Sequence, residues 1–165
     1  MANKIYIVSE TAITWKSSGG TEAFFITGTP GALGSGAGRQ GALHDFGTAV
    51  KSHRYRWRAR ITPGATQVVD EVIGIFWKTG DGTTYDNDDG VADQAVSAID
   101  KLKNVTPIGT IVIDEAAAVV MSAHGEIEFS ERWGGPIFWN YTANSLSSTM
   151  TTYGFDLQPI PDEIQ

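Results

Sequence analysis

The residues best suited to catalysis are three glutamates in the stretch GEIEFSE, at positions 125–131. Successive side chains of a strand point to opposite faces, so Glu126 and Glu128 would share one face. Glu131 could join them across a β-bulge. Carboxylates gathered in this way can serve as nucleophile and general acid. The simpler interpretation is a strand whose acidic side chains face solvent or basic neighbours.

The spacing E-x-E-x-x-E resembles the E-x-D-x-x-E signature of jelly-roll endoglucanases of the laminarinase type. In that family two glutamates act as nucleophile and acid in a retaining mechanism. The resemblance implies these roles for Glu126 and Glu131. The chain has Glu128 where that family has aspartate, and its 165 residues are few for that family. This interpretation therefore ranks behind the two given below.

A second charged pattern occupies HRYRWRARI, at positions 53–61. Its four arginines are Arg54, Arg56, Arg58 and Arg60. If the stretch is a strand, we expect Tyr55, Trp57 and Ile61 to face the core and the arginines to face the other way. Opposite charges on adjacent strands stabilise a sheet, so we expect the arginines to meet carboxylates. These carboxylates would lie on a neighbouring strand such as GEIEFSE or on a partner subunit.

The net charge argues against direct binding of nucleic acid. The chain carries 19 acidic and 12 basic residues, a net charge of −7, and this field repels phosphate. Replacing Arg56 and Arg58 with alanine is therefore expected to weaken folding or assembly and to leave any retention of DNA unchanged.

No motif for a cofactor or metal is complete. Gly36, Gly38 and Gly41 match the dinucleotide fingerprint, but the strand before it and the helix after it are missing. In DNDDG, at 86–90, an EF-hand count would place Val96 where a glutamate is required. No close pair of histidines of the cupin type occurs. We predict no cofactor and no metal.

The acidic turn leaves one alternative open. The aspartates between 81 and 93 could gather a hard cation through loop geometry alone, or they could form a solvated turn.

The composition indicates a globular protein used without export. Hydrophobic residues make up 41% and charged residues 19% of the chain, and there are no cysteines. The N-terminus shows no signal peptide, and no apolar run approaches the roughly 18 residues of a membrane span. We therefore expect no membrane contact.

Short strands separated by turn residues dominate the pattern, which predicts an all-β, jelly-roll-like β-sandwich in a single domain over 1–165. The predicted strands lie at 4–8, 13–15, 22–28, 42–47, 53–61, 71–80, 108–114, 117–131, 136–142 and 151–157.

The remaining segments are expected to be loops, arms and one short helix. Residues 91–103 have apolar side chains at helical spacing, which allows a short helix there. The glycines between 29 and 41 predict a loop. Residues 1–10 are expected to form an arm or edge strand, and 158–165 an extended arm.

Three blocks of sequence resemble the head decoration, or cement, proteins of tailed bacteriophages. The first is GRQGALHDFG (38–47) followed by YRWRARI (55–61), and the second is GIFWKTGDGTTYDNDDG (74–90). The third is GEIEFSERWGGPIFWNYT (125–142), with PIPDEIQ (159–165) at the end. The resemblance rests on the order and spacing of these blocks and covers 38–165.

The resemblance implies a structural protein without enzymatic activity. Such proteins bind the outside of a capsid as oligomers, often trimers, and reinforce the shell. The implied partner is the major capsid protein, and the implied location is the capsid surface of a virion assembled in the host cytoplasm. We expect the contact residues to be the four arginines of 53–61 together with Arg39 and Trp133.

The alternative is a carbohydrate-binding jelly-roll module. Tryptophans such as Trp133 and Trp139 could stack on sugar rings, although aromatic residues of strands are more often part of the core.

Overall fold

Eight strands in the computed structural model pair in the order of a jelly roll, the first with the last and so on inward. The four antiparallel pairs are β1 (Ile13–Lys16) with β11 (Gly154–Ile160), β3 (Gly38–Gln40) with β10 (Trp133–Asn140), β5 (Arg54–Ile61) with β9 (Met121–Glu128), and β6 (Val72–Gly80) with β8 (Thr106–Val112). The structure describes residues 10–24, 33–48, 52–64, 66–87, 89–96, 98–115, 119–147 and 153–160. This pairing confirms the predicted all-β jelly-roll sandwich.

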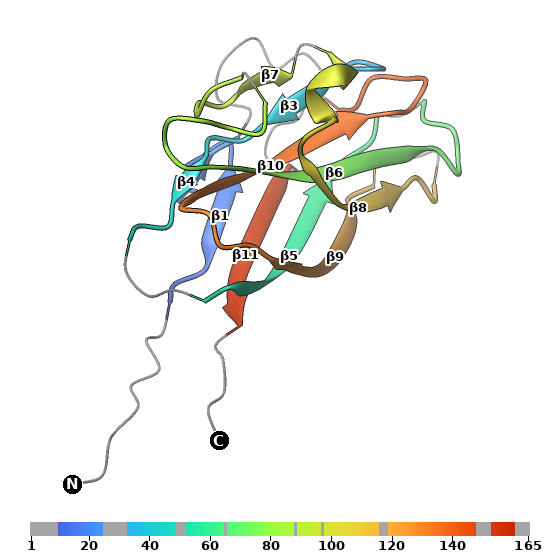
Figure 1. Ribbon diagram of the computed structural model, residues 1–165. Helices are drawn as coiled ribbons and strands as arrows, with labels where there is room; N and C mark the ends of the chain where they lie inside the picture. The colour runs from blue at the N-terminus through green and yellow to red at the C-terminus, as the bar shows by residue number, and fades with distance from the viewer. Residues whose placement is uncertain are drawn as a thin grey trace, which may run out of the picture.

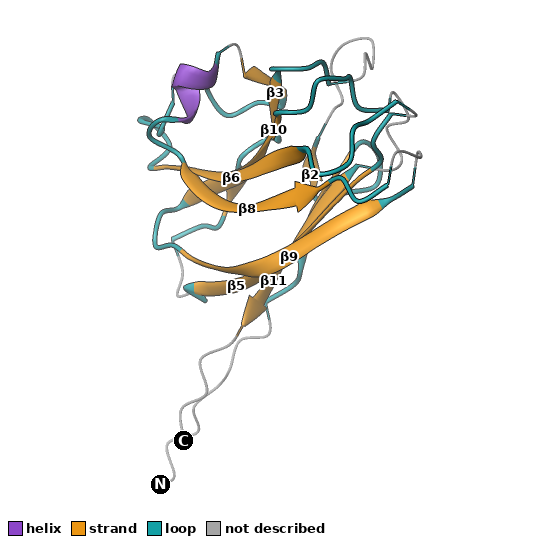
Figure 2. Ribbon diagram, turned by 90° about the vertical axis from the view of Figure 1, so that its right-hand side faces the viewer, coloured by secondary structure: helices purple, strands orange, loops and turns teal. Residues whose placement is uncertain are grey.

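The strands form two sheets that pack face to face (Figures 1 and 2). Sheet A has the order β2-β1-β11-β5-β9 and sheet B the order β7-β3-β10-β6-β8. The shorter strands are β2 (Glu22–Ala23), β4 (His44–Asp45) and β7 (Gln94–Val96). Strand β4 pairs with β10 outside the main path of sheet B.

The core between the sheets is built from aromatic side chains. Trp15, Trp77 and Phe155 contact one another, with ring centroids 5.7 to 5.9 Å apart. Trp57 stacks on Phe155 at 6.1 Å. Each of these residues is at most 2% exposed, so the inward faces of both sheets are closed to water.

The two sheets differ on their outer faces. Residues 89–93 and 98–105, on either side of β7, cover the outer face of sheet B at β3 and β10, and they include the 3₁₀-helix η1 (Ile99–Leu102), which lies next to β3 (Figure 2). Leu102 packs there against Ile137 and Trp139 in a second apolar cluster. On sheet A, by contrast, the outward side chains of β5 and β9 are mostly exposed.

The acidic turn is the part of this cover that polar bonds hold in place. Lys78, which is fully buried on β6, donates to the Gly90 carbonyl at 2.6 Å and to Oε1 of Gln40 at 3.1 Å. Nε2 of Gln40 donates to the carbonyls of Asp89, Gly90 and Ala92 at 2.8 to 3.3 Å. These bonds give the buried Lys78 ammonium and the buried Gln40 amide their partners beneath the turn.

Most predicted strands are confirmed within the described residues. The helix allowed near 91–103 is reduced to the four residues of η1, because Gln94–Val96 pairs with β3 as β7. Residues 1–9, which include the predicted strand at 4–8 and most of the predicted arm over 1–10, lie outside the described residues, and so do residues 25–32, which include the end of the strand predicted at 22–28.

Two predicted boundaries are wrong. The glycine-rich loop was expected to run from 29 to 41, but Gly38–Gln40 forms β3 in the interior of sheet B. Glycine is needed in this strand because a Cβ on Gly38 would lie 2.4 Å from Cε3 of Trp139.

The second wrong boundary is the extended arm predicted over 158–165. Residues 158–160 continue β11 and pair with β5, while 161–165 lie outside the described residues. Strand β1 begins at Ile13, opposite Leu157, so one side of Pro159 has no partner in β1. Proline is tolerated at such an edge position.

Candidate functional site

The candidate site is the outward face of β5, which we call the arginine face. Arg54, Arg56 and Arg58 are exposed and Arg60 is half-buried, whereas Tyr55, Trp57, Ala59 and Ile61 are buried. This alternation confirms the orientation predicted from the sequence. The arginine face therefore lies on the uncovered side of sheet A.

Strand β9 lies beside β5, which is one of the two arrangements that the charge pattern left open. In the register of the two strands, Arg54 is opposite Glu128 and Arg56 is opposite Glu126. Arg54 binds both carboxylates, with Nη2 3.0 Å from Glu126 and Nε 3.1 Å from Glu128. The predicted meeting of arginines and glutamates is thus confirmed at one end of the strand.

At the other end of the arginine face, Arg60 binds a carboxylate from β11. Its Nη2 atom lies 2.6 Å from Oδ2 of Asp156. Asp156 is opposite Arg58, not Arg60, in the register of β5 and β11. The ion pair is therefore diagonal, and so is the pair of Arg54 with Glu126 on the β9 side.

The carboxylates opposite the two central arginines, Arg56 and Arg58, are bound by the outer arginines of the strand. Glu126 stands opposite Arg56 but is bound by Arg54, and Asp156 stands opposite Arg58 but is bound by Arg60. Among the described residues, neither Arg56 nor Arg58 forms an ion pair or a side-chain hydrogen bond. The two central guanidinium groups therefore keep N–H donors that no described carboxylate accepts.

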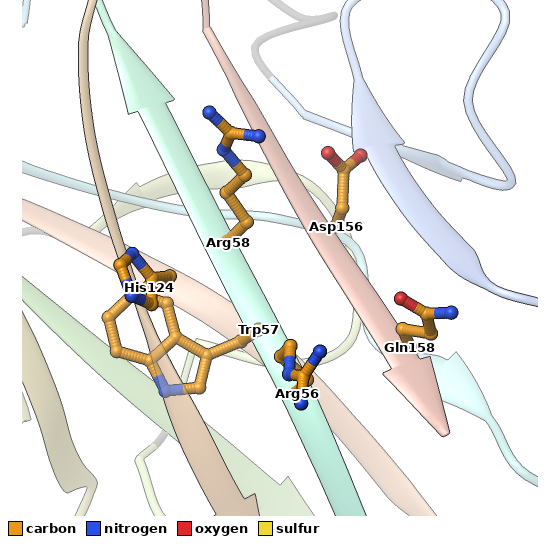
Figure 3. Close-up of a pocket in the computed structure, with 6 residues that line it drawn as sticks. All are labelled: Arg56, Trp57, Arg58, His124, Asp156 and Gln158. Carbon is orange, nitrogen blue, oxygen red and sulfur yellow. The ribbon is translucent and has the colours of Figure 1, made fainter. Parts of the chain in front are cut away.

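A surface depression of about 480 Å³ lies at this position. Its lining residues are Arg56, Trp57, Arg58, His124, Asp156 and Gln158. Figure 3 shows Arg56 and Arg58 on the central strand, with His124 on one flank and Asp156 and Gln158 on the other. An arrangement of two guanidinium groups around a depression can bind an anionic group by charge-assisted hydrogen bonds.

Arg39, which is also predicted as a contact residue, forms an ion pair within sheet B and its cover. Its guanidinium makes two parallel bonds to Asp93, Nε to Oδ1 at 2.7 Å and Nη2 to Oδ2 at 2.9 Å. The side chain of Arg39 is 14% exposed and that of Asp93 is 3% exposed. Arg39 fastens β3 to the segment that covers sheet B, and the structure does not bring it together with the arginine face.

Trp133 lies at the start of β10 in sheet B, also away from the arginine face. It is half-buried, with the Arg132 guanidinium 5.7 Å from its ring centroid. Trp139 is 3% exposed and belongs to the apolar cluster beneath η1. Burial of Trp139 removes one of the two aromatic platforms considered for sugar binding.

The glutamates considered for catalysis are placed for charge pairing. Glu126 and Glu128 share the outer face of β9, and Arg54 binds both. Glu131 follows the end of β9, where its carboxylate accepts the Ser130 N–H at 3.1 Å. None of the three lines the depression on the arginine face.

Two aspartates of the acidic turn, Asp81 and Asp86, bind nearby groups of the same turn and of β6. The N–H groups of Thr84 and Thr83 bind Asp81 and hold the pKa of its carboxyl below the usual value. Asp86 accepts the N–H and the hydroxyl of Thr79 at 2.6 and 2.9 Å. Within the described ranges, no three metal-ligating side chains come together as a group that could hold an ion.

Three lining residues of the depression were not singled out from the sequence: His124, Asp156 and Gln158. His124 lies opposite Arg58 in the register of β5 and β9. A usable signal was its position two residues before Glu126, which places both side chains on the same face of β9. Asp156 and Gln158 carried no signal because the pairing of β11 with β5 joins distant parts of the sequence.

Comparisons with known proteins show little similarity. No protein-family model matches the chain, and no curated protein matches it. Among solved structures, a crystal structure of murine APRIL at pH 5.0 is similar at 8% sequence identity, with 79% of each chain covered and a TM-score of 0.39. The likeness concerns only the general arrangement of strands, and the jelly-roll assignment rests on the strand pairs of this chain. No helix in the described part of the chain is long and apolar enough to cross a membrane.

Proposed function

We propose that the protein is a structural component of a bacteriophage virion, which binds the outside of the capsid as an oligomer and stabilises the shell. The observation that carries this proposal is the difference between the two outer faces. Residues 89–93 and 98–105 cover sheet B at β3 and β10, while the arginine face of sheet A stays exposed with Arg56 and Arg58 unpaired among the described residues. A charged and uncovered sheet face suits contact with another protein.

The sequence resemblance to head decoration proteins supplies the identity of the partner. On this proposal the partner is the major capsid protein, and a homotrimer is the expected oligomer. Several subunits that each make a modest contact would together hold neighbouring capsomers, because linking binding sites raises the total affinity without new contacts. The protein would then have no catalytic role, no direct contact with nucleic acid and no contact with a membrane.

The proposal is tested with the purified full chain and with empty shells of the capsid protein encoded in the same genome. Light scattering measures the oligomer, and the disruption temperature of the shells is measured with and without the protein. We expect an oligomer and a higher disruption temperature. A monomer that leaves the disruption temperature unchanged would contradict the proposal.

The carbohydrate-binding alternative is tested by measuring binding of the same purified protein to a glycan array. We expect no specific glycan, because Trp139 is buried and Trp133 is partly covered by Arg132. Saturable binding to one glycan, lost on Trp133→Ala, would favour the alternative.

A further inference from the structure

The depression on the arginine face has the charge of an anion receptor. Arg56 and Arg58 supply two guanidinium groups, and His124 adds an imidazole opposite Arg58. The one carboxylate in the lining, Asp156, is bound by Arg60 at 2.6 Å, and Gln158 is neutral. No lining carboxylate is left to neutralise the two central arginines.

The spacing of the two arginines indicates the form of the anion. They lie two residues apart on one face of a strand, which corresponds to roughly 6.6 Å along the strand. An extended peptide with acidic side chains at every second residue has the same repeat. Each guanidinium can bind one carboxylate through two parallel N–H groups.

The surroundings disfavour a nucleic acid or another dense polyanion. Glu126 and Glu128 lie beside the depression on β9, with side chains 50% and 72% exposed. The whole chain also carries a net charge of −7. A continuous row of phosphates would meet these charges, whereas a short acidic segment would contact only the central pair.

We propose that the depression formed by Arg56, Arg58 and His124 binds the carboxylates of an extended acidic segment of a partner protein. This inference deepens the proposed function. It rests on that function only where it names the capsid shell as the partner. The chemistry of the receptor follows from the side chains of sheet A.

The direct test measures binding of a synthetic peptide of alternating glutamate and threonine to the full chain. We expect saturable binding that weakens about tenfold or more in the double variant Arg56→Ala/Arg58→Ala, which removes two charge-assisted contacts. The matched control is Lys101→Ala/Lys103→Ala, which makes the same change in net charge on the side of sheet B. An equal loss of peptide affinity in the control, or no loss in the arginine variant, would contradict the proposal that this depression binds the peptide.

A second variant separates loss of the receptor from loss of the fold. His124→Glu places a carboxylate opposite Arg58, as Glu126 and Glu128 already stand opposite Arg56 and Arg54. The new side chain should occupy the receptor from within, so peptide binding should fall by a similar factor while the unfolding midpoint stays the same or rises. Unchanged peptide affinity in a folded His124→Glu protein would contradict the proposal.

Two further probes identify the class of anion. Inorganic sulfate is expected to compete only weakly, and a single-stranded oligonucleotide is expected to bind no better to the wild type than to the arginine variant. An oligonucleotide that binds more tightly than the peptide and depends on Arg56 and Arg58 would overturn the acidic protein segment as the ligand.

The shell assay tests the proposed capsid function independently of the peptide-binding assay. Peptide binding that depends on the arginines, in a protein that does not bind shells, would leave the receptor and remove the capsid as partner. Shell binding that is equal for the wild type and the Arg56→Ala/Arg58→Ala protein would leave the capsid function and exclude this depression as the contact.

Discussion

Gly125 of β9 lies directly opposite Trp57 of β5, and a Cβ on Gly125 would lie only 2.8 Å from Cζ2 of the indole. Gly109 on sheet B makes the same kind of approach, with its Cβ position 2.7 Å from Cη2 of the Trp57 ring. The indole is therefore held between two glycines, one from each sheet. This explains how a tryptophan that is 2% exposed fits into a sandwich of short strands.

Gly125→Ala is expected to lower the free energy of unfolding by about 1–3 kcal/mol, the usual cost of adding a methyl group to a filled core. Urea unfolding followed by tryptophan fluorescence would measure the change. Gly34→Ala is the matched control, because nothing lies within 4 Å of a Cβ at that position. The control should change stability by no more than about 0.5 kcal/mol. Equal stabilities of the two variants would show that the Trp57 ring can move away at no cost.

Asn140, at the end of β10, is the hub of a buried hydrogen-bond network. Its Nδ2 group donates to the carbonyls of Leu33, Gly34 and Asn144 at 2.9 to 3.1 Å. Its Oδ1 atom accepts the N–H and the hydroxyl of Thr142 at 2.9 and 2.7 Å. One fully buried side chain thus joins the segment before β3 to the segment after β10.

Asn140→Asp keeps the shape of the side chain and replaces the donor group with an oxygen that faces three carbonyls. We expect a loss of about 3 kcal/mol or more, because a buried charge would be left without donors on that side. Thermal unfolding at neutral pH measures the loss. Asn144→Asp is a suitable control, since its Nδ2 group makes one exposed bond to the Thr66 carbonyl. A variant Asn140→Asp as stable as the control would contradict the proposed role of the amide.

The strands could be predicted from the sequence where burial follows a simple period. The alternation in 53–61 predicted which side chains of β5 face the core, and the apolar run in 71–80 predicted the strand that is β6. Strand β3 was missed because its glycine was counted as a loop residue, although Trp139 requires it. A glycine that makes room for a distant aromatic ring has the same appearance in a sequence as a glycine in a flexible turn.

The arginine face could be predicted, but its unpaired centre could not. Repeated charges at the same period in two stretches allowed β5 and β9 to be neighbours, but a partner subunit remained the alternative until the strand pairing was known. Which carboxylate binds which arginine depends on diagonal contacts between side chains and on β11, whose position is set by the topology of the whole sandwich. The burial of Lys78 beneath the acidic turn also gave no sequence signal, because its partners are mainly backbone carbonyls and the Gln40 amide.

The ion pair of Asp45 and Arg132 gives a prediction for acidic pH. Two parallel bonds of 2.6 Å from Arg132, helped by the Gly47 N–H, lower the pKa of Asp45 to about 2 from its usual 3.8. Because the pKa is lower in the folded state, the pair stabilises the fold fully above pH 3.8 and loses this effect as the pH falls toward 2.

Arg132→Leu is expected to raise the pKa of Asp45 toward its usual value, as followed by carboxyl carbon NMR. The Gly47 N–H bond to Oδ1 remains at 2.8 Å, so part of the lowering should persist. Arg132→Lys keeps the charge without the two parallel bonds and should give an intermediate pKa. A pKa that stays near 2 in Arg132→Leu would show that the arginine is not the main cause.

Lys78→Met tests whether the buried ammonium holds the acidic turn against sheet B. The substitution keeps most of the volume but removes the bonds from Nζ to the Gly90 carbonyl and to Gln40. Gly90 still receives the Gln40 amide at 3.2 Å, whereas Oε1 of Gln40 loses the Lys78 donor. We expect the local stability of the turn to fall by roughly 1–3 kcal/mol.

Native-state hydrogen exchange at the Leu43 amide reports this change, because that N–H group bonds to the carbonyl of Val91 in the turn at 2.8 Å. Exchange at Leu43 should accelerate in Lys78→Met, while amides at the centre of β10 should change much less. Lys103→Met is the matched control, since the side chain of Lys103 is 73% exposed and pairs with Asp100 at the surface. If Leu43 exchanges equally slowly in both variants, the three carbonyl bonds of the Gln40 amide are sufficient to hold the turn, and the buried charge of Lys78 must be retained for another reason.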